Sequence, residues 1–509
     1  MPLTTQEWGA IIRLLITTPS PILLTGITGS LGGWLAKEAL SRGIPVLALV
    51  RDASADGARR RVAAALETAG AADFSRGVEI VLGDICQEGL GLAPSSRRAV
   101  AAAGAVVHCA ASTEFDDSAR EATAEVNVAG TRHVLALAAQ LRVPLAHVST
   151  AYVAGRRTGI ALEGETDVGQ AFNNVYEQTK CQAEVLVHRW AAETGLPAIV
   201  LRPSIVTGDR QGGRMVRLNT LHRLLRAFHV IAPHVGSGEF RVMADPGATK
   251  NIVPVDTFAD LAWRLIERGV PGAYHVTHPA PLRLGELRDI FAALFNMPGL
   301  RLVGREDFAR RPPTEAEQFY QAAAATYDPY MAAEPCFDRA RTDAALAGAC
   351  PAAPELDAAF FGRLLAYGRA TRWRSHLVPP KEGRAPAAGG IERYFSEFLA
   401  AKMNRPLLPD LRRLTAAFRI AVRGVAGRPW FLSVERGVLV AMARNGEAAA
   451  CTFVTDPPTF REVVAGRLPP QKAFFDRRID VEGDVETGLK VAGVLAAFFR
   501  QFPYDTAKG

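Results

Sequence analysis

The sequence predicts an α/β protein built on a doubly wound parallel sheet, followed by a separate α+β domain. Three observations predict this arrangement. Between 21 and 208, short continuous apolar runs alternate with helical segments, as strands buried on both faces do. A glycine-rich turn, TGITGSLG at 25–32, joins the first run to the first helix. A Pro-, Gly- and Ala-rich linker at 378–390 precedes a block of about 120 residues, enough for an independent domain.

Length and composition indicate a globular protein of several domains. The chain has 509 residues, too many for one ordinary core, and 49% of them are hydrophobic. The net charge is +7, but the basic residues are scattered, so we expect no nucleic-acid partner. The six cysteines show no CxxC spacing, which indicates reduced thiols and a cytoplasmic protein.

No targeting or membrane-spanning segment is expected. The first residues lack a charged stretch followed by a long apolar run, and no apolar run reaches about 18 residues. Residues 6–16 have the pattern of a short amphipathic helix. We expect that helix to pack on the first domain, with peripheral contact to a lipid surface as the alternative.

The predicted strands and helices alternate along the first domain, which spans 1–210. We expect helices over 127–141 and 174–194, and a βαβ rhythm of this kind favours a parallel sheet. From 211 to 377 helices dominate, with short strands near 250–256 and 272–278, and we interpret this part as a substrate-binding subdomain. The linker at 378–390 and a last domain at 391–509 follow. The strands expected in the first domain are ILLT (22–25), PVLALV (45–50), VEIVLGD (78–84), AVVHCA (105–110), LAHVST (145–150) and PAIVLRP (197–203).

The glycine turn predicts a dinucleotide site. Gly26 lets the chain leave the strand sharply, Gly29 allows the backbone to approach a pyrophosphate, and Gly32 lets the helix lie close to the sheet. The amides at the helix start then face the phosphate. Because the turn follows a strand and opens a helix, nucleotide binding is favoured over ordinary tight packing. The cradle also includes Thr25, Thr28, Ser30 and Leu31.

Arg51 stands at the end of the second strand and favours NADPH as the cofactor. An acid at this position would bind a ribose 2′-hydroxyl and repel a 2′-phosphate, whereas an arginine can pair with that phosphate through two hydrogen bonds. The neighbouring Asp52 should point the opposite way. An exposed surface arginine is the alternative interpretation.

Tyr176 and Lys180 lie four residues apart and therefore share one face of a predicted helix. A free phenol has a pKa of about 10, and a nearby ammonium would favour the phenolate. Tyr176 could then act as general acid toward a carbonyl that accepts a hydride, while Lys180 holds the nicotinamide ribose. A solvated helix face is the alternative, and the position after the strand 145–150 argues against it.

Together these motifs resemble an extended short-chain dehydrogenase/reductase with a Rossmann sheet. The motifs are TGITGSLG, GDI (83–85), HCAAS (108–112), NVAGT (127–131), VSTAYVAG (148–155), YEQTK (176–180) and LRPSIVTG (201–208). The resemblance is closest to the thioester-reductase and fatty acyl-CoA reductase branch, through segments at 240–256, 274–278 and 329–346.

The resemblance implies further site residues. Asp84 and Ile85 would border the adenine, and Ala110 and Ala111 would line the cofactor channel. Pro203 would pass near the nicotinamide, and Asn127 would support the hydrogen-bond network of the site. The family also places a hydroxyl beside the tyrosine. Ser149 and Thr150 should face opposite sides of their strand, and the register favours Thr150.

The block after the linker resembles the sterol-carrier-protein family, best over FREVVAGRLPPQKAFFDRRIDVEGD at 460–484. This resemblance implies a sheet covered by helices around an apolar tunnel for acyl chains or sterols. Apolar residues on the helices are the basis for a lipid site, although such residues more often fill a core. They are Phe474, Phe475, Leu495, Phe498 and Phe499.

The leading hypothesis is an NADPH-dependent reductase of a lipid-like acyl thioester, carried by coenzyme A or an acyl carrier protein. Its product would be an aldehyde and, after a second hydride transfer, an alcohol. The alternatives are another extended dehydrogenase or epimerase, acting on a sterol, hydroxy-lipid or nucleotide sugar, and a lipid-transfer protein with an inactive reductase half. No HExxH or paired Cys/His spacing predicts a metal site, and no GxSxG elbow predicts a serine hydrolase.

Overall fold

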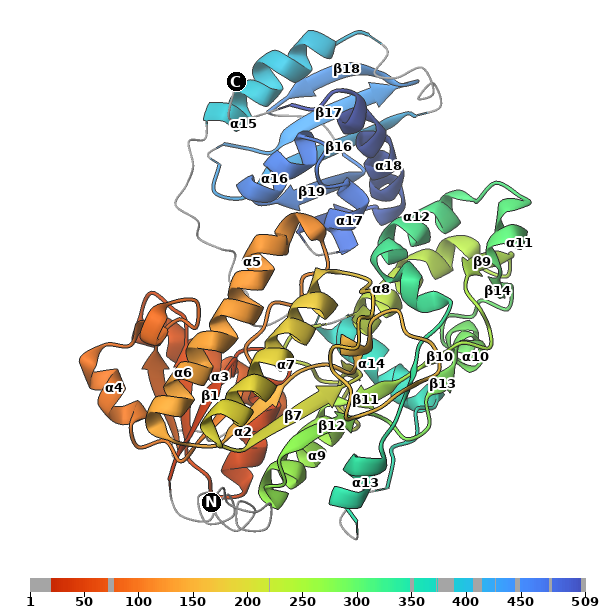
Figure 1. Ribbon diagram of the computed structural model, residues 1–509. Helices are drawn as coiled ribbons and strands as arrows, with labels where there is room; N and C mark the ends of the chain where they lie inside the picture. The colour runs from red at the N-terminus through yellow and green to blue at the C-terminus, as the bar shows by residue number, and fades with distance from the viewer. Residues whose placement is uncertain are drawn as a thin grey trace. The chain divides into compact units, whose positions relative to one another are not determined.

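The computed structural model describes the chain as two compact units, which are taken one at a time below (Figure 1). The first contains residues up to 222, 243–305 and 326–377, and the second contains 223–242, 306–325 and 378–509. The expected helix at 6–16 and most of the expected linker lie outside the described residues. Those are 20–71, 77–218, 220–347, 352–371, 373, 389–405, 414–425, 427–444, 449–475 and 478–504.

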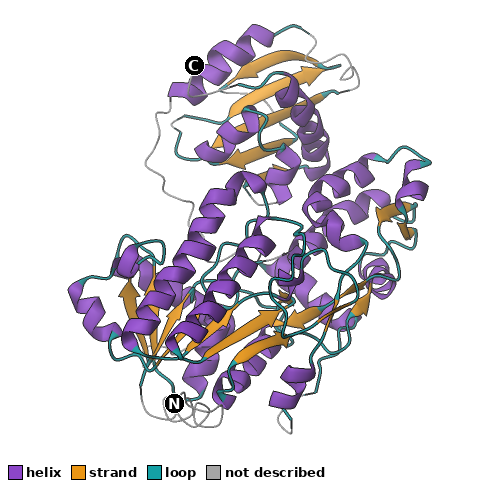
Figure 2. Cartoon of the chain, in the orientation of Figure 1, coloured by secondary structure: helices purple, strands orange, loops and turns teal. Residues whose placement is uncertain are grey.

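A seven-stranded sheet forms the centre of the first unit, and all of its strand pairs are parallel (Figure 2). The strand order is β12-β7-β5-β4-β1-β2-β3, so the chain runs outward from β1 in both directions. This arrangement confirms the predicted doubly wound fold. The strands are β1 (Ile22–Thr25), β2 (Val46–Val50), β3 (Val78–Leu82), β4 (Ala105–His108), β5 (Leu145–Val148), β7 (Ala198–Pro203) and β12 (Gly272–Val276).

Alternate residues of each strand face two separate cores, because successive side chains point to opposite faces. Ile22 and Leu24 of β1 pack with one set of helices, while Leu23 packs with the other. The first set is α2 (Gly32–Ser41), α3 (Ala55–Ala69) and α9 (Val255–Arg268), and the second set includes α4 (Pro94–Val100), α6 (Gly130–Leu141) and α7 (Val175–Thr194). Burial on both faces explains why the strands read as continuous apolar runs.

Two helix starts position polar groups at the carboxyl end of the sheet. Asn174 caps α7 by accepting a hydrogen bond from the amide of Glu177, 3.0 Å away. The helix that we expected from residue 127 instead begins as α5 (Arg120–Ala124), passes through a π-helical turn, η3 (Glu125–Ala129), and continues as α6. A π turn inside a helix reorients the side chains around it.

The remaining elements of the first unit are short pairs and helices that follow or flank the sheet. β8 (Ile205–Thr207) pairs with β11 (Ile252–Pro254), β10 (Thr249–Lys250) with β13 (Leu282–Arg283), and β6 (Ile160–Ala161) with β15 (Cys336–Phe337). The others include α10 (Leu284–Leu294), β14 (Leu300–Val303), η5 (Ala325–Met331), α13 (Ala340–Ala345) and α14 (Ala358–Ala370).

A five-stranded sheet in the order β18-β17-β16-β19-β20 is the centre of the second unit. Its strands are β16 (Ala416–Val422), β17 (Trp430–Glu435), β18 (Val438–Ala443), β19 (Cys451–Thr455) and β20 (Ile479–Gly483). The helices are α15 (Gly389–Arg393), η6 (Tyr394–Leu399), α16 (Pro457–Val464), α17 (Pro470–Phe475) and α18 (Val485–Gln501). This α+β domain also agrees with the predicted fold class.

The second unit also includes parts of two helices from the middle of the chain, α8 (Thr220–Val235) and α12 (Glu315–Ala324). The buried guanidinium of Arg226 donates to the backbone oxygen of Phe474, 3.0 Å away, and lies over the Phe474 ring. Phe319 of α12 also contacts the Phe474 ring, so residues from both mid-chain segments pack with α17, a grouping that no sequence motif predicts.

Candidate active site

The glycine turn after β1 is packed so closely that only glycine fits at two of its positions. Gly26 has φ +79°, and a Cβ there would lie 2.6 Å from the amide nitrogen of Ala110. A Cβ on Gly32 would lie 2.1 Å from the oxygen of Gly26. The amide of Gly29 donates to the same Gly26 oxygen at 2.8 Å, which closes the turn. The helix start is thereby held against the sheet.

The start of α2 has free capacity for an anion. Leu31 precedes the helix and supplies no side-chain hydrogen bond to its first amides. Thr25 instead turns toward β4, where its Oγ1 accepts from the amides of Cys109 and Ala110 at 3.2 and 3.1 Å. Ser30 donates to the backbone oxygen of Arg217 at 3.3 Å. These residues fit the pyrophosphate cradle of a dinucleotide.

Four charged side chains lie near the end of β2. Arg51 is 72% exposed and lies 3.7 Å from the carboxylate of Asp84. Asp52 turns away from it and accepts from the amide of Ser54 and from Arg61, at 3.1 and 3.2 Å. The guanidinium of Arg61 also donates to the oxygen of Arg51 at 2.8 Å and to Thr28 Oγ1 at 3.3 Å. Arg61 therefore joins the end of β2 to the glycine turn, which the sequence did not reveal.

The two residues expected beside an adenine lie just after β3. Asp84 accepts from the amide of Cys86 at 3.0 Å through its Oδ1. Ile85 is buried against Gly130, where a Cβ would lie 2.8 Å from the Ile85 Cδ1. Ala111 is exposed in the loop after β4, next to Ala110. These residues occupy the same edge of the sheet as the glycine turn, because the carboxyl ends of parallel strands meet there.

Tyr176 and Thr150 lie together beyond the end of β5. Their side-chain hydroxyls share a hydrogen bond. Burial nevertheless raises the pKa of Tyr176 to about 12, and the bond to Thr150 opposes this rise only in part. The expected shift toward the phenolate is therefore wrong for the structure as it stands, because desolvation outweighs the favourable contacts. A group with this pKa is protonated at neutral pH and can serve as a proton donor.

Lys180 lies one turn further along α7 and is almost fully buried, with 2% of its surface exposed. Its Nζ donates to the oxygen of Val148 at 2.8 Å and lies 3.3 Å from His147 Nε2. Burial lowers the pKa of Lys180 to about 8. The ammonium of Lys180 therefore contacts β5, through His147 and Val148, and not the Tyr176 hydroxyl that we expected it to approach.

The hydroxyls of Ser149 and Thr150 have different partners. Ser149 donates to the carboxylate of Glu184 at 2.7 Å, in a buried network with Arg202. Thr150 Oγ1 accepts from the amide of Tyr152 at 3.2 Å, lies 3.5 Å from the oxygen of Pro203 and also contacts Tyr176. Pro203 lies at the end of β7, next to β5 in the sheet. Thr150 is thus the hydroxyl placed beside the phenol.

Asn127 sits in the π turn and links three segments. Its Oδ1 accepts from the amide of Ser112 at 2.7 Å, and its Nδ2 donates to the Ser112 oxygen and to Thr179 Oγ1, each at 3.0 Å. Thr179 is the residue before Lys180 on α7. Asn127 therefore connects the loop after β4 to the helix that carries Tyr176 and Lys180.

Aromatic side chains that the sequence did not single out surround Tyr176. Phe115 stacks on its ring with centroids 5.6 Å apart, and Phe115 also contacts Tyr327 and Tyr330. The Tyr330 hydroxyl donates to Glu177, and it accepts from Asn174 at 2.7 Å. The segment around η5 is thereby attached to the first turn of α7. Nothing in the local pattern could have paired residues so distant in sequence.

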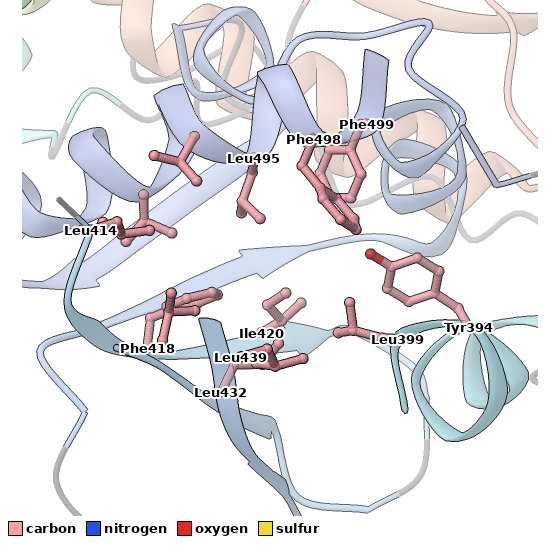
Figure 3. Close-up of a pocket in the computed structure, with 13 residues that line it drawn as sticks. Tyr394, Leu399, Leu414, Phe418, Ile420, Leu432, Leu439, Leu495, Phe498 and Phe499 are labelled. Carbon is pink, nitrogen blue, oxygen red and sulfur yellow. The ribbon is translucent and has the colours of Figure 1, made fainter. Parts of the chain in front are cut away.

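In the second unit, an apolar cavity of about 20 Å³ lies between α18 and the sheet (Figure 3). Leu495, Phe498 and Phe499 face it from the helix (Figure 3). Tyr394 is the polar side chain among the lining residues, and its hydroxyl points toward Phe498 and Phe499. The sheet side is lined by Phe418, Ile420, Leu432, Val434 and Leu439. Of the expected lipid-site residues whose side chains the structure describes, Phe474 is not among those lining it.

Comparison with known families agrees with both parts of this picture. Residues 24–262 match the family described as "Male sterility protein", and residues 395–496 match the "SCP-2 sterol transfer family". The chain therefore contains one segment similar to the male sterility family and, further along, one similar to the SCP-2 family. The resemblance inferred from the motifs, to an extended short-chain dehydrogenase/reductase of this branch with a C-terminal sterol-carrier-type domain, is confirmed.

Curated relatives match the male-sterility-type domain over part of their length. The nonribosomal peptide synthetase asaC of Aspergillus flavus is 32% identical over 208 residues, which cover 38% of this chain and 20% of that protein. Fatty acyl-CoA reductase 2 of Homo sapiens is 26% identical over 283 residues, covering 47% of this chain and 53% of the relative. The chain thus spans about half or less of these relatives.

Solved structures share the fold of the same domain. The terminal R domain from the myxalamid pathway is 25% identical with a TM-score of 0.59, and the match covers 73% of this chain and 98% of that one. The reductase domain of a nonribosomal peptide synthetase from Mycobacterium tuberculosis is 20% identical with a TM-score of 0.56, and the match covers 73% of this chain and 100% of that one.

Within the part of the chain that the structure describes, none of the helices has the length and apolar composition needed to span a membrane.

Proposed function

We propose that the protein is an NADPH-dependent reductase of a lipid-like acyl thioester. The observation that carries the proposal is the hydrogen-bonded pair of Tyr176 and Thr150, with Lys180 one turn away, at the sheet edge that also carries the glycine turn. A phenol, a hydroxyl and a lysine beside a dinucleotide cradle suit hydride transfer to a carbonyl. The expected cytoplasmic location belongs to the same proposal.

The residues of the site have distinct roles in this reaction. Bound NADPH supplies the hydride that reduces the thioester carbonyl. Thr150 and Tyr176 donate hydrogen bonds to the developing oxyanion, and Tyr176 transfers its phenolic proton to it. The resulting hemithioacetal breaks down to an aldehyde and the free thiol. Lys180 holds the nicotinamide ribose, and Asn127 keeps α7 aligned with the loop after β4.

Two arginines support the choice of NADPH over NADH. Arg51 is exposed at the end of β2, and Arg61 reaches the same strand end from α3. A 2′-phosphate placed there would meet two guanidinium groups, and bonds of this type are stronger than neutral ones. Asp52 is already engaged by Ser54 and Arg61, so it does not offer a free carboxylate to a ribose hydroxyl.

The SCP-2-type domain supports a substrate with an apolar chain. Its cavity is lined by aliphatic and aromatic side chains, with the Tyr394 hydroxyl as the polar group (Figure 3). A volume of about 20 Å³ holds about one water molecule, so an acyl chain requires side chains of α18 to move aside. We propose that this domain holds the chain near the reductase and so raises its local concentration.

The relatives suggest the carrier of the acyl group. One similar structure is a thiolation-reductase di-domain from an archaeal nonribosomal peptide synthetase, with 16% identity and a TM-score of 0.55. Other relatives are named as peptide synthetases or as a fatty acyl-CoA reductase. We therefore propose an acyl-carrier-protein or coenzyme A thioester as substrate, reduced to the aldehyde and, in a second round of the same chemistry, to the alcohol.

A direct assay tests this function. Purified full-length protein is incubated with NADPH and with acyl-CoA or acyl-carrier-protein thioesters of several chain lengths, and NADPH consumption and products are measured. The proposal expects thiol release with each aldehyde formed and a preference for long chains. Turnover of UDP-sugars or sterols in place of thioesters would favour the dehydrogenase or epimerase alternative. Lipid transfer without any NADPH consumption would favour a transfer protein.

A further inference from the structure

A buried histidine of β5 contacts the side chain of Lys180. His147 belongs to β5, is completely buried, and its Nε2 lies 3.3 Å from Lys180 Nζ. The next residue, Val148, accepts from the same Nζ through its backbone oxygen at 2.8 Å. Two of the three protons of the ammonium are therefore directed at β5. An ammonium carries three protons, so one remains for a further acceptor.

The contact specifies which nitrogen of His147 carries a proton. An ammonium has three donors and no acceptor, so Nε2 of a neutral imidazole must accept, and the proton resides on Nδ1. His147 Nδ1 is buried and has no hydrogen-bond partner among the described residues. An aliphatic side chain would fill this space without leaving a buried N–H unpaired. The unpaired Nδ1–H therefore makes His147 less favourable for stability than an aliphatic residue, and the contact of its Nε2 with Lys180 offsets this.

Other groups around the pair keep the imidazole neutral. His108 of β4 lies beside it, with ring centroids 5.3 Å apart, and is held by Thr25 Oγ1 at 2.7 Å and Thr131 Oγ1 at 3.1 Å. Burial, and then the charge of Lys180, lower the pKa of His147 well below its usual value, with smaller contributions from His108 and His188. The charge environment of Lys180 also includes Cys109 and Glu184.

We propose that His147 is a positioning residue for Lys180: its Nε2 accepts from the ammonium and, with the Val148 oxygen, fixes the direction of the remaining proton. This inference rests on the proposed function for its effect on rate. The arrangement of the two side chains does not depend on the substrate, and it can be tested in the protein without cofactor.

Two variants separate acceptance of a hydrogen bond from filling of space. His147→Leu removes the acceptor, whereas His147→Gln places an amide oxygen close to the position of Nε2. We expect His147→Leu to lower kcat about ten- to a hundred-fold, the loss for a hydrogen bond to a charged group, and His147→Gln to recover most of it. In His147→Leu, but not in His147→Gln, the fall of kcat at high pH should begin at a lower pH, because the Lys180 ammonium loses an acceptor. Unchanged kcat in a folded His147→Leu protein, or equal loss in both variants, would overturn the proposal.

A spectroscopic measurement decides the matter independently of turnover. The wild-type protein is labelled with ¹⁵N-histidine, and ring tautomers are determined from two-bond ¹H–¹⁵N correlations. The His147 signals are identified by their absence in His147→Gln. We expect a proton on Nδ1 and an unprotonated Nε2. A proton on Nε2, or on both nitrogens, would overturn the proposal even if the enzyme is active. If no thioester is reduced, the proposed function fails while this measurement still tests His147.

Discussion

Ser149 donates its hydroxyl proton to Glu184 across 2.7 Å and therefore faces away from Tyr176. Its neighbour Thr150 has the opposite orientation and shares a hydrogen bond with the Tyr176 hydroxyl. Two adjacent hydroxyls thus serve different parts of the molecule, as alternation along a strand requires. One belongs to a buried ion-pair network, and the other lies where an oxyanion would form.

Replacing these two hydroxyls should have opposite consequences. Thr150→Ala removes a donor to the oxyanion, and we expect kcat to fall about 10²- to 10³-fold with a small loss of thermal stability, because the hydroxyl also accepts from the Tyr152 amide. Ser149→Ala leaves Glu184 with one partner fewer, and we expect the free energy of unfolding to fall by about 1–3 kcal/mol with kcat nearly unchanged. Steady-state kinetics and thermal unfolding of both proteins check this. A larger loss of kcat in Ser149→Ala would mean that the roles are reversed.

Tyr176→Phe tests the proton donor. The substitution keeps the ring that stacks on Phe115 and removes only the hydroxyl, so NADPH binding should be unchanged. Turnover should fall about 10²- to 10⁴-fold, the usual contribution of general acid catalysis. NADPH affinity by fluorescence titration is measured beside kcat. Normal turnover in this variant would remove Tyr176 from the mechanism.

Arg51 and Arg61 are expected to select the cofactor. Arg51→Asp should weaken NADPH binding about ten- to a hundred-fold, because it removes a charged contact and adds repulsion. Arg61→Gln should weaken NADPH about tenfold and NADH much less. Arg59→Gln provides a matched control on α3, since Arg59 is exposed on the same helix. Equal loss of NADPH and NADH affinity in Arg61→Gln would assign that residue to the fold of the turn instead.

Glu184 makes stability depend on pH in a defined range. Burial disfavours its charge, but the charge of Arg202 and hydrogen bonds from His188, Arg202 and Ser149 outweigh this and lower its pKa to about 2. The pKa of Glu184 in the folded protein is below its unfolded value of about 4.3. Its contribution to the free energy of unfolding is therefore complete above that pH and is lost as the pH falls toward 2. Glu184→Gln should lower the free energy of unfolding by about 3–5 kcal/mol at pH 7. The difference from wild type should shrink between pH 4.5 and pH 2. Unfolding curves at several pH values check this, and a constant difference would contradict it.

The cavity of the SCP-2-type domain predicts a steric test of lipid binding. Leu495→Trp places a larger ring into the space between α18 and the sheet, and we expect binding of a fluorescent fatty acid to weaken at least about tenfold. Leu495→Ala should bind as well as wild type or better, because it enlarges the same space. The ratio of kcat/KM for long against short thioesters should fall in Leu495→Trp only. An unchanged ratio together with unchanged lipid binding would separate the cavity from substrate delivery.

The order of elements was predictable because the central strands of the seven-stranded sheet, such as β1, β2 and β4, are buried on both faces and therefore form continuous apolar runs. The place of β12 in the sheet was harder to predict, because its segment, near 272–278, has the pattern of an isolated strand in a mostly helical region. Its partner β7 lies about 70 residues earlier, and a pairing at this distance leaves no local signal. The glycine turn could be predicted because its backbone geometry requires glycine.

The candidate site likewise contains residues that could be predicted from the sequence and residues that could not. Tyr176, Lys180 and Thr150 lie in short motifs whose spacing already places them on one helix face and one strand end. Arg61, His147 and the aromatic residues around Tyr176 have no such spacing. Tyr330 reaches Glu177 only because the fold returns η5 to the first turn of α7. The pKa of Tyr176 was misjudged for a related reason, since burial is a property of the folded neighbourhood and not of the YxxxK pattern.

Because of the π turn at Glu125–Ala129, the geometry of the site depends on the number of residues in the helix formed by α5, η3 and α6. A π turn holds one residue more than an α turn, so the side chains that follow it are rotated by about 100° relative to an uninterrupted helix. Asn127 reaches both Ser112 and Thr179 from within this turn. Removing a single residue there would leave the composition nearly unchanged and restore regular helical phase, while carrying Asn127 away from one of its two partners. The geometry of the site therefore fixes the number of residues in this helix.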